Sequence, residues 1–199
     1  MSEKRLFRRW IELPFLYKIQ LCAFLLAGIC GAIAYPLTTK LIYSSVNVEV
    51  LAGRMVLSSI IGISLSVAWL TIQERLYSYF VPLTLIECFS YIGLVTYVIV
   101  YQDYNSYLIL STLISGTIGH LVTGAHSKLH QQITDVEQYR TDYGFFIEIV
   151  ASVGVLVGSG IAVWFDITMP VAFITLLISL IGFEMVDIYI YKKMKKQTK

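Results

Sequence analysis

The sequence predicts an all-α membrane protein, a six transmembrane helix bundle with N and C termini cytoplasmic. Three observations support this fold class. Hydrophobic residues make up 57% of the 199 residues and charged residues only 14%, which leaves too much apolar surface for a soluble domain. The apolar residues fall into six continuous blocks, each close to the about 20 residues that a helix needs to cross a bilayer. The basic residues are distributed unevenly around these blocks.

The six predicted spans follow one another with little chain between them. Tryptophan and tyrosine residues cluster at their ends, as amphipathic rings favour the membrane interface. The predicted spans are 16–39, 51–72, 80–101, 106–127, 143–165 and 168–191. The chain therefore divides into a cytoplasmic amphipathic N-terminal segment (1–15), a six-helix transmembrane domain (16–191) and a basic cytoplasmic tail (192–199).

The distribution of basic residues predicts the orientation in the cell membrane. Of the 15 Lys and Arg residues, only Lys40 and Arg54 fall on the outer side of the threaded spans. Cytoplasmic segments carry an excess of Lys and Arg, so both termini are expected inside. We expect Lys40 and Arg54 to extend to the interface, with Asp103, Asp166 or an anionic solute as alternative partners.

Several classes of function lack their sequence signals. No nucleotide-binding, serine-hydrolase or zinc-protease motif is present, so we expect neither enzyme activity nor a cofactor. A net charge of +2 is too small to indicate a nucleic-acid partner. Cys22, Cys30 and Cys88 lie in spans without a CxxC pair and are expected to pack. His126 and His130 are one turn apart, but their place in a basic loop favours a solvated surface over a metal site.

Small residues recur at a spacing of four in several spans. This spacing puts them on one helix face, where they allow two backbones to approach closely within a membrane. The sets are Ala27 and Gly31, Gly28 and Ala32, Ser58 with Gly62 and Ser66, Gly116 with His120 and Gly124, and Gly154 with Gly158. We expect these faces to pack helices together, within the chain or against a second copy.

Ionisable residues inside the spans are the strongest functional signal, because burying a charge at that depth costs at least about 2.5 kcal/mol. Glu87 lies seven residues past Phe80, and Glu184 lies eight residues before Lys192. At 1.5 Å per residue, both carboxyl groups lie about 10 to 12 Å from the inner boundary. His120 and Glu148 fall in the same half of their spans. We expect the four candidates to form one inward-facing cluster that binds a proton or a cation: Glu87, His120, Glu148 and Glu184.

An alternative arrangement places Glu184 and Asp187 against the inner headgroups and lets Glu148 bond a neighbouring helix. If Glu87 and Glu184 instead share a cavity, two like charges at close range cannot both ionise at low cost. We then expect activity to depend on pH, and that dependence to be lost when either glutamate is replaced by Gln.

Glycines in the fifth span and charged residues in the two inner loops form a further pattern. They are Glu74, Arg75, Arg140, Gly154, Gly158 and Gly160. With six spans and both ends inside, this pattern resembles one half of a major facilitator superfamily transporter. In that family a charged turn between the second and third helices fastens the inner gate, and Glu74 and Arg75 would take its acidic and basic positions. The glycine expected ahead of them is missing, and 76–79 lack the Gly and basic residues that should follow.

This resemblance implies a 3+3 inverted repeat, of which the matched depth of Glu87 and Glu184 is a hint. It also implies a half-size secondary transporter, or a remnant of one, that moves a small solute or drug with proton coupling. Because the family builds its path from two halves, we expect a homodimer or pairing with a second six-helix half in the lipid bilayer. The alternatives are a substrate-capture membrane subunit of an energy-coupling ATPase transporter, and an accessory or immunity-type membrane protein without transport activity.

Overall fold

The computed structural model describes residues 11, 13–45, 47–134 and 137–197, with side chains described except at 41–43, 45, 66–74, 76, 127, 130–143 and 197. Most of the predicted N-terminal segment 1–15 lies outside these ranges. Every regular element within them is a helix. The elements are α2 (Phe15–Ser45), α3 (Val48–Ser78), α4 (Phe80–Tyr101), α5 (Tyr104–Ile114), the π-helical turn η1 (Ser115–Gly119), α6 (His120–Thr134), α7 (Glu137–Trp164) and α8 (Met169–Gln197).

Six of the helical segments are long and apolar enough to cross a membrane. They are Phe15–Lys40, Val48–Leu65, Phe80–Tyr101, Tyr104–His126, Gly144–Trp164 and Met169–Lys196. The prediction of a multi-pass, all-α membrane protein with six spans is therefore confirmed. One boundary was wrong: α3 continues to Ser78, so Glu74 and Arg75 lie in the last turns of a helix and not in a loop.

The turn between α4 and α5 shows how local chemistry ends one helix and begins the next. Gln102 takes a left-handed conformation (φ 53°), and its N–H donates to the carbonyl of Val98 at 3.0 Å. Asp103 then caps α5, because its Oδ1 accepts from the N–H of Ser106 at 3.1 Å. The hydroxyl of Ser106, and then its N–H, hold the pKa of the Asp103 carboxyl below its ordinary value.

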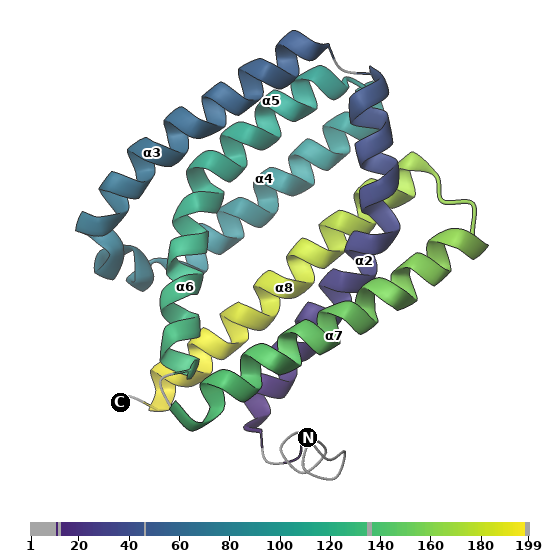
Figure 1. The fold of residues 1–199 in the computed structure, drawn as a ribbon. Coiled ribbons are helices and arrows are strands. Elements are labelled where there is room, and N and C mark those ends of the chain that lie inside the picture. Colours follow the sequence, from purple (N-terminus) through teal and green to yellow (C-terminus); the bar gives the residue numbers. More distant parts are fainter. Residues whose placement is uncertain (1–10, 12, 46, 135–136, 198–199) are drawn as a thin grey trace.

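The helices lie roughly side by side, with α3 at one edge and α7 at the opposite edge (Figure 1). α2 packs against α7 and α8, the span formed by α5, η1 and α6 packs against α3 and α4, and α4 packs against α8. These contacts have a two-fold pattern. The pattern appears when the first, second and third spans are matched to the fourth, fifth and sixth. The contacts of α2 with the fifth and sixth spans then correspond to the contacts of the fourth span with α3 and α4. The contact between α4 and α8, the third and sixth spans, is unchanged by the exchange.

α2 and α7 approach each other backbone to backbone. A Cβ added at Gly28 would lie 2.7 Å from the carbonyl oxygen of Ala151, and one at Gly154 would lie 2.6 Å from that of Leu25. One at Gly158 would meet the carbonyl oxygen of Ile29. We call Gly28, Gly154 and Gly158 the glycine seam. Two of the five predicted small-residue faces thus meet each other, as close packing in a membrane requires.

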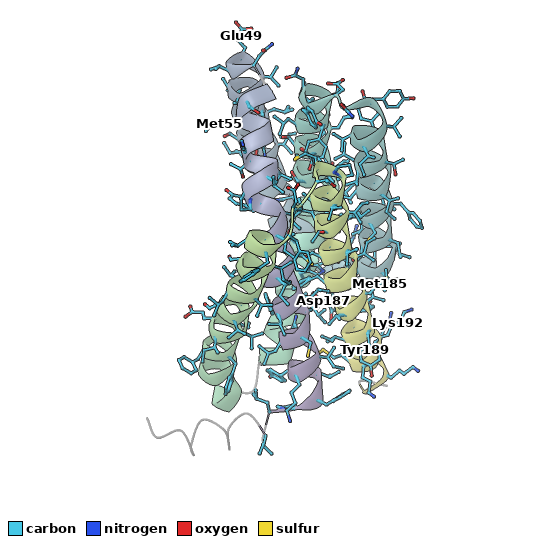
Figure 2. All side chains as sticks on the ribbon, turned by 90° about the vertical axis from the view of Figure 1, so that its right-hand side faces the viewer. Glu49, Met55, Met185, Asp187, Tyr189 and Lys192 are labelled. Atoms are coloured by element: carbon cyan, nitrogen blue, oxygen red, sulfur yellow. The ribbon has the colours of Figure 1, made fainter. Side chains whose placement is uncertain are left out.

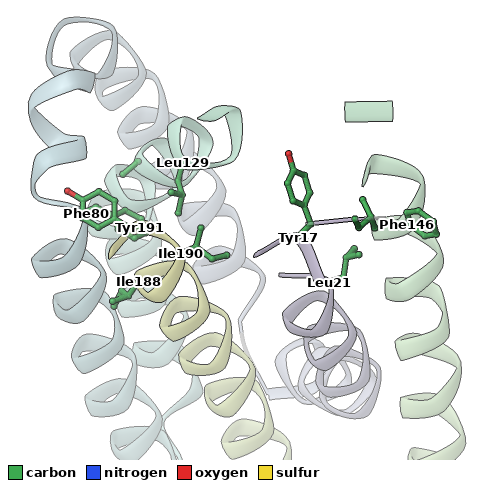
Figure 3. Close-up of a cluster of buried hydrophobic side chains, with 10 residues drawn as sticks. Tyr17, Leu21, Phe80, Leu129, Phe146, Ile188, Ile190 and Tyr191 are labelled. Atoms are coloured by element: carbon green, nitrogen blue, oxygen red, sulfur yellow. The ribbon is translucent and has the colours of Figure 1, made fainter. Parts of the chain in front are cut away.

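An apolar cluster closes the end of the bundle where α2 begins and α8 ends, here called the terminal end. Leu13 precedes α2, and the other members come from five helices. The cluster, part of which is labelled in Figure 3, consists of Leu13, Tyr17, Leu21, Phe80, Ala125, Leu129, Phe146, Ile188, Ile190 and Tyr191. The start of α2 and the end of α8 therefore lie on the same side of the bundle (Figure 1).

Candidate functional site

Four polar side chains from three helices meet behind this apolar cluster. Nε2 of His126, on α6, lies 3.0 Å from Oε2 of Glu184 and 3.5 Å from Oδ2 of Asp187, both on α8. On the opposite side of Asp187, the side-chain N–H of Gln20, on α2, donates to Oδ1 at 3.1 Å. The Asp187 and Gln20 side chains are fully buried, and His126 is only 14% exposed. Asp187 is therefore held from both sides.

The sequence of α8 places these carboxyl groups inside by helical periodicity. Glu184, Asp187 and Ile188 are buried, whereas Met185 and Tyr189 on the other face are exposed. The spacing of three and four between buried positions is that of one helix face. Figure 2 shows Asp187 in the half of α8 near the terminal end, one helix turn and more before Lys192.

Glu87 joins the group from α4, where it is 7% exposed and within electrostatic range of Glu184 and His126. Its carboxylate fits beside the π-helical turn: a Cβ added at Gly119 would lie 2.9 Å from Oε1 of Glu87. The glycine and the extra residue of the turn thus make room for the carboxylate. Oε2 of Glu87 is buried and has no hydrogen-bond partner among the described residues. π-helical turns of this kind are frequent at functional sites.

We call Glu87, His126, Glu184 and Asp187 the buried polar cluster, with Gln20 as its hydrogen-bonding partner. If all four groups were ionised, three carboxylates would face one imidazolium. An uncompensated charge in a buried site is strongly unfavourable, so neutrality requires the uptake of protons or of a cation. The chemistry that the cluster supports is therefore reversible binding of a positive charge.

An aromatic layer separates the cluster from the terminal end. The ring of Phe80 lies 5.1 Å from that of His126 and 5.2 Å from that of Tyr191, and Tyr77 packs edge-on against Tyr191 at 5.2 Å. Burial, and then the nearby Tyr191, raise the pKa of Tyr77 to about 12. The Nζ of Lys128 lies over the Tyr77 ring at 5.4 Å. On this side the cluster is covered.

Two cavities lie between α4, α5 and α8, on the side of the cluster away from the aromatic layer. The nearer one has a volume of about 170 Å³ and begins one helix turn from Glu87 and Glu184, at Tyr91 and Leu180. The farther one, of about 250 Å³, shares Phe173 with it and extends to the helix ends at Gln102 and Met169. The open space beside the cluster therefore faces away from the terminal end.

The structure brings together two of the four residues predicted to form one cluster. Glu87 and Glu184 share the site. Glu148 lies on an exposed face of α7. His120 is six residues before His126, about 9 Å along the helix and on a different face. Among the described residues, no hydrogen bond or ion pair joins His120 to either glutamate. The alternative in which Glu184 and Asp187 face the headgroups is wrong, because both are buried.

His126 is the residue that sequence reasoning misplaced. It was expected on a solvated loop, and instead it lies at the centre of the cluster in a helix that continues beyond the span. The signal was present in the sequence, since buried Val122, Ala125 and Leu129 recur at helical spacing on the same face. Gln20 was missed in the same way, beside buried Tyr17 and Leu21.

The predicted Glu74–Arg75 pair and the His126–His130 pair each include a side chain that the structure does not describe. The side chain of Glu74 lies outside them, while Arg75 is exposed in the last turn of α3. The role of this pair in an inner gate stays a prediction. The side chain of His130 also lies outside them, and His126 has the carboxyl groups of Glu184 and Asp187 as its neighbours.

Fold and site together define a class: an integral membrane protein of six helices with a buried histidine–carboxylate cluster between its helices. Comparison with protein-family models, curated proteins and solved structures finds no match to this chain. We therefore infer the function from the geometry of the site.

Proposed function

We propose that this protein is a half-size secondary transporter that moves a small solute or drug across the cell membrane and couples this movement to protons. The buried polar cluster is the observation that carries the proposal. Ionisable groups within spans are unfavourable unless they have a role, and they mark proton relays in many pumps and transporters. Histidine changes its charge near neutral pH, and the adjacent carboxyl groups give the proton alternative binding positions.

The surroundings of the cluster support alternating access. The aromatic layer of Tyr77, Phe80 and Tyr191 covers it toward the terminal end, while the cavities between α4, α5 and α8 lie on the other side. A coupling site must communicate with one side of the membrane at a time. We propose that this conformation is the one closed at the terminal end.

The pattern of helix contacts supports the resemblance to half of a major facilitator superfamily transporter. Matching the first three spans to the last three reproduces the contacts of α2 with α7 and α8 as contacts of the fourth span with α3 and α4. Three spans per repeat make the two repeats opposite in direction, which is a 3+3 inverted repeat. The matched depth of Glu87 and Glu184 is not part of this support, because such a repeat relates opposite ends of the paired helices. A second copy, or another six-helix half, would complete the path.

We also propose that the terminal end faces the cytoplasm, because the basic residues of the sequence gather there. Lys128 and the exposed Lys192 and Lys195 are at this end. Reporter fusions at residues 1 and 199 test the orientation. A signal from outside the cell at either fusion would contradict it.

Proton binding can be tested before the solute is known. We expect the purified protein in lipid vesicles to show an infrared carboxyl band whose intensity changes as the pH is varied, and Glu87→Gln to remove part of it. Glu148→Gln is the matched control, since it replaces an exposed glutamate on α7 outside the cluster, and it should keep the cluster's band. Equal spectra for the two variants would refute proton binding at the cluster.

Coupling is tested with a pH-sensitive dye inside the same vesicles during a screen of candidate solutes. A solute that the protein transports should move protons in the wild type and in Glu148→Gln, and not in Glu87→Gln or Glu184→Gln. Unaltered pH dependence of transport in both cluster variants would make the glutamates structural hydrogen-bonding groups. Co-isolation of an ATPase with the chain would instead favour the substrate-capture alternative.

A further inference from the structure

A second charged group lies within a span, far from the buried polar cluster. Arg54 is on the second turn of α3, near the end of the bundle opposite the termini. Its Nε donates to Oγ1 of Thr112, on α5, at 3.0 Å. The hydroxyl of Thr112 in turn donates to the carbonyl of Leu108 at 2.8 Å, and the Thr112 side chain is buried. Arg54 is therefore tied to the neighbouring helix and does not simply extend to the interface, as the sequence suggested.

The rest of the guanidinium group is open to a cavity of about 420 Å³, which is lined by Leu51, Arg54, Met55, Ser58 and Ser59. Figure 2 shows the position of this part of α3, where Glu49 and Met55 are labelled. Within the described part of the chain, Arg54 forms no ion pair, either with Glu49 or with Asp103. A cation within a span normally pairs with an anion or faces a water-filled cavity.

Ser58 supplies a second donor on the same side. It lies four residues after Arg54, which places both on one helix face. Its hydroxyl forms no hydrogen bond with the described residues, whereas that of Ser59 donates to the carbonyl of Met55 at 2.9 Å. Arg54 and Ser58 both line the cavity, and neither the Ser58 hydroxyl nor the Nη groups of Arg54 have an acceptor among the described residues.

From this geometry we propose that Arg54 and Ser58 bind the anionic group of a ligand, a phosphate or a carboxylate, in the cavity beside α3. The planar guanidinium suits such groups, because its parallel N–H donors match two oxygens at once. Thr112 positions the guanidinium by its bond to Nε and leaves the Nη groups for the ligand. The anionic group has two sources, a small solute from water or the headgroup of a lipid. The site is independent of proton binding at the polar cluster.

Thermal unfolding of the purified chain in lipid-free detergent micelles tests the site. The probes are inorganic phosphate, compared with chloride at equal ionic strength, and phosphatidylglycerol, compared with phosphatidylcholine. We expect one of the anionic probes to raise the melting temperature by about 2–4 °C. A rise with inorganic phosphate identifies a site for a soluble anion, and a rise with phosphatidylglycerol alone identifies a lipid site. No rise with either probe would overturn the proposal.

Substitutions test whether the rise in melting temperature comes from binding at Arg54. Arg54→Gln should weaken the apparent affinity for the effective probe by about tenfold or more, as expected when a charged hydrogen-bonding partner is lost. Thr112→Val keeps the shape but removes the acceptor for Nε, so it should weaken the affinity less. Lys40→Gln, the control at the same end of the bundle, and Glu87→Gln should leave the probe's effect unchanged. If Arg54→Gln keeps the effect, or Lys40→Gln loses it equally, the site is not at Arg54.

Discussion

The glycine seam and the buried polar cluster join helices of the same bundle in opposite ways. Along the seam, α2 and α7 approach until backbone meets backbone, and a Cβ at Gly154 would lie 2.6 Å from a carbonyl oxygen. At the cluster, α4, α6 and α8 meet through long polar side chains, and Nε2 of His126 lies 3.0 Å from Oε2 of Glu184. The glycine seam leaves no space for a further side chain between α2 and α7. The buried polar cluster has atoms that can bind a proton. We therefore expect the seam to fix the position of two helices and the cluster to bind protons.

Replacing His126 is the sharpest way to break the cluster. His126→Gln removes the only basic partner described there and leaves carboxyl groups uncompensated, which costs about 3–5 kcal/mol when one member of a buried pair is lost. We expect the free energy of unfolding in mixed micelles to fall by this amount at pH 7 and by less at pH 5, because protons then neutralise the carboxyl groups. His120→Gln is the matched control. Equal losses in the two variants would show that the ion pair contributes nothing.

The glycine seam should respond to volume and not to pH. Gly154→Ala forces α2 and α7 apart, and overpacking of this kind costs about 1–3 kcal/mol. Gly160→Ala, on the same helix, adds its methyl group where nothing lies within 4 Å and should leave the stability unchanged or slightly higher. Melting curves of both variants at pH 5 and pH 7 test this. A loss that depends on pH at Gly154 would contradict the division between seam and cluster.

Gly119 connects packing with proton binding. In Gly119→Ala the new methyl group meets Oε1 of Glu87, which is the flexible end of a side chain and can move at a cost of about 0.5–1.5 kcal/mol. We expect a small change in stability but a measurable shift in the pH titration of the infrared carboxyl band. Gly93→Ala, which adds its methyl group in open space on α4, is the control. An unshifted titration would place Glu87 outside the proton-binding group.

The smallest expected effect concerns Asp103, in the turn between α4 and α5, whose pH response should differ from that of the buried polar cluster. Hydrogen bonds from Ser106 lower the pKa of Asp103, so its contribution to stability is present above its ordinary pKa of about 3.9 and is lost as the pH falls through the lowered value. Asp103→Asn should therefore change the pH dependence of the melting temperature only below about pH 4. A change between pH 5 and pH 8 would mean that this turn contributes to the response assigned to the cluster.

The sequence by itself determined the class of the molecule. Six apolar blocks must form helices, because only helices of that length satisfy their own backbone hydrogen bonds in lipid. It also identified Glu87 and Glu184 as unusual, since their burial has a high cost wherever they lie. The glycines of α2 and α7 were recognised as packing faces from their spacing alone. These conclusions depend on properties of single helices, which local sequence contains.

The tertiary structure decided which polar groups meet. Position along a span can be estimated from the sequence, but rotation about the helix axis and the choice of neighbouring helices cannot. The sequence therefore did not show that Glu148 lies on an exposed face of α7 or that His120 lies on a different face of α6 from His126. His126 belongs to the site because its imidazole meets Glu184 and Asp187 of α8. Gln20 belongs to it because α2 packs against α8. Arg54 likewise bonds Thr112 because α3 packs against α5. Such pairings depend on how whole helices pack, and no single helix encodes them.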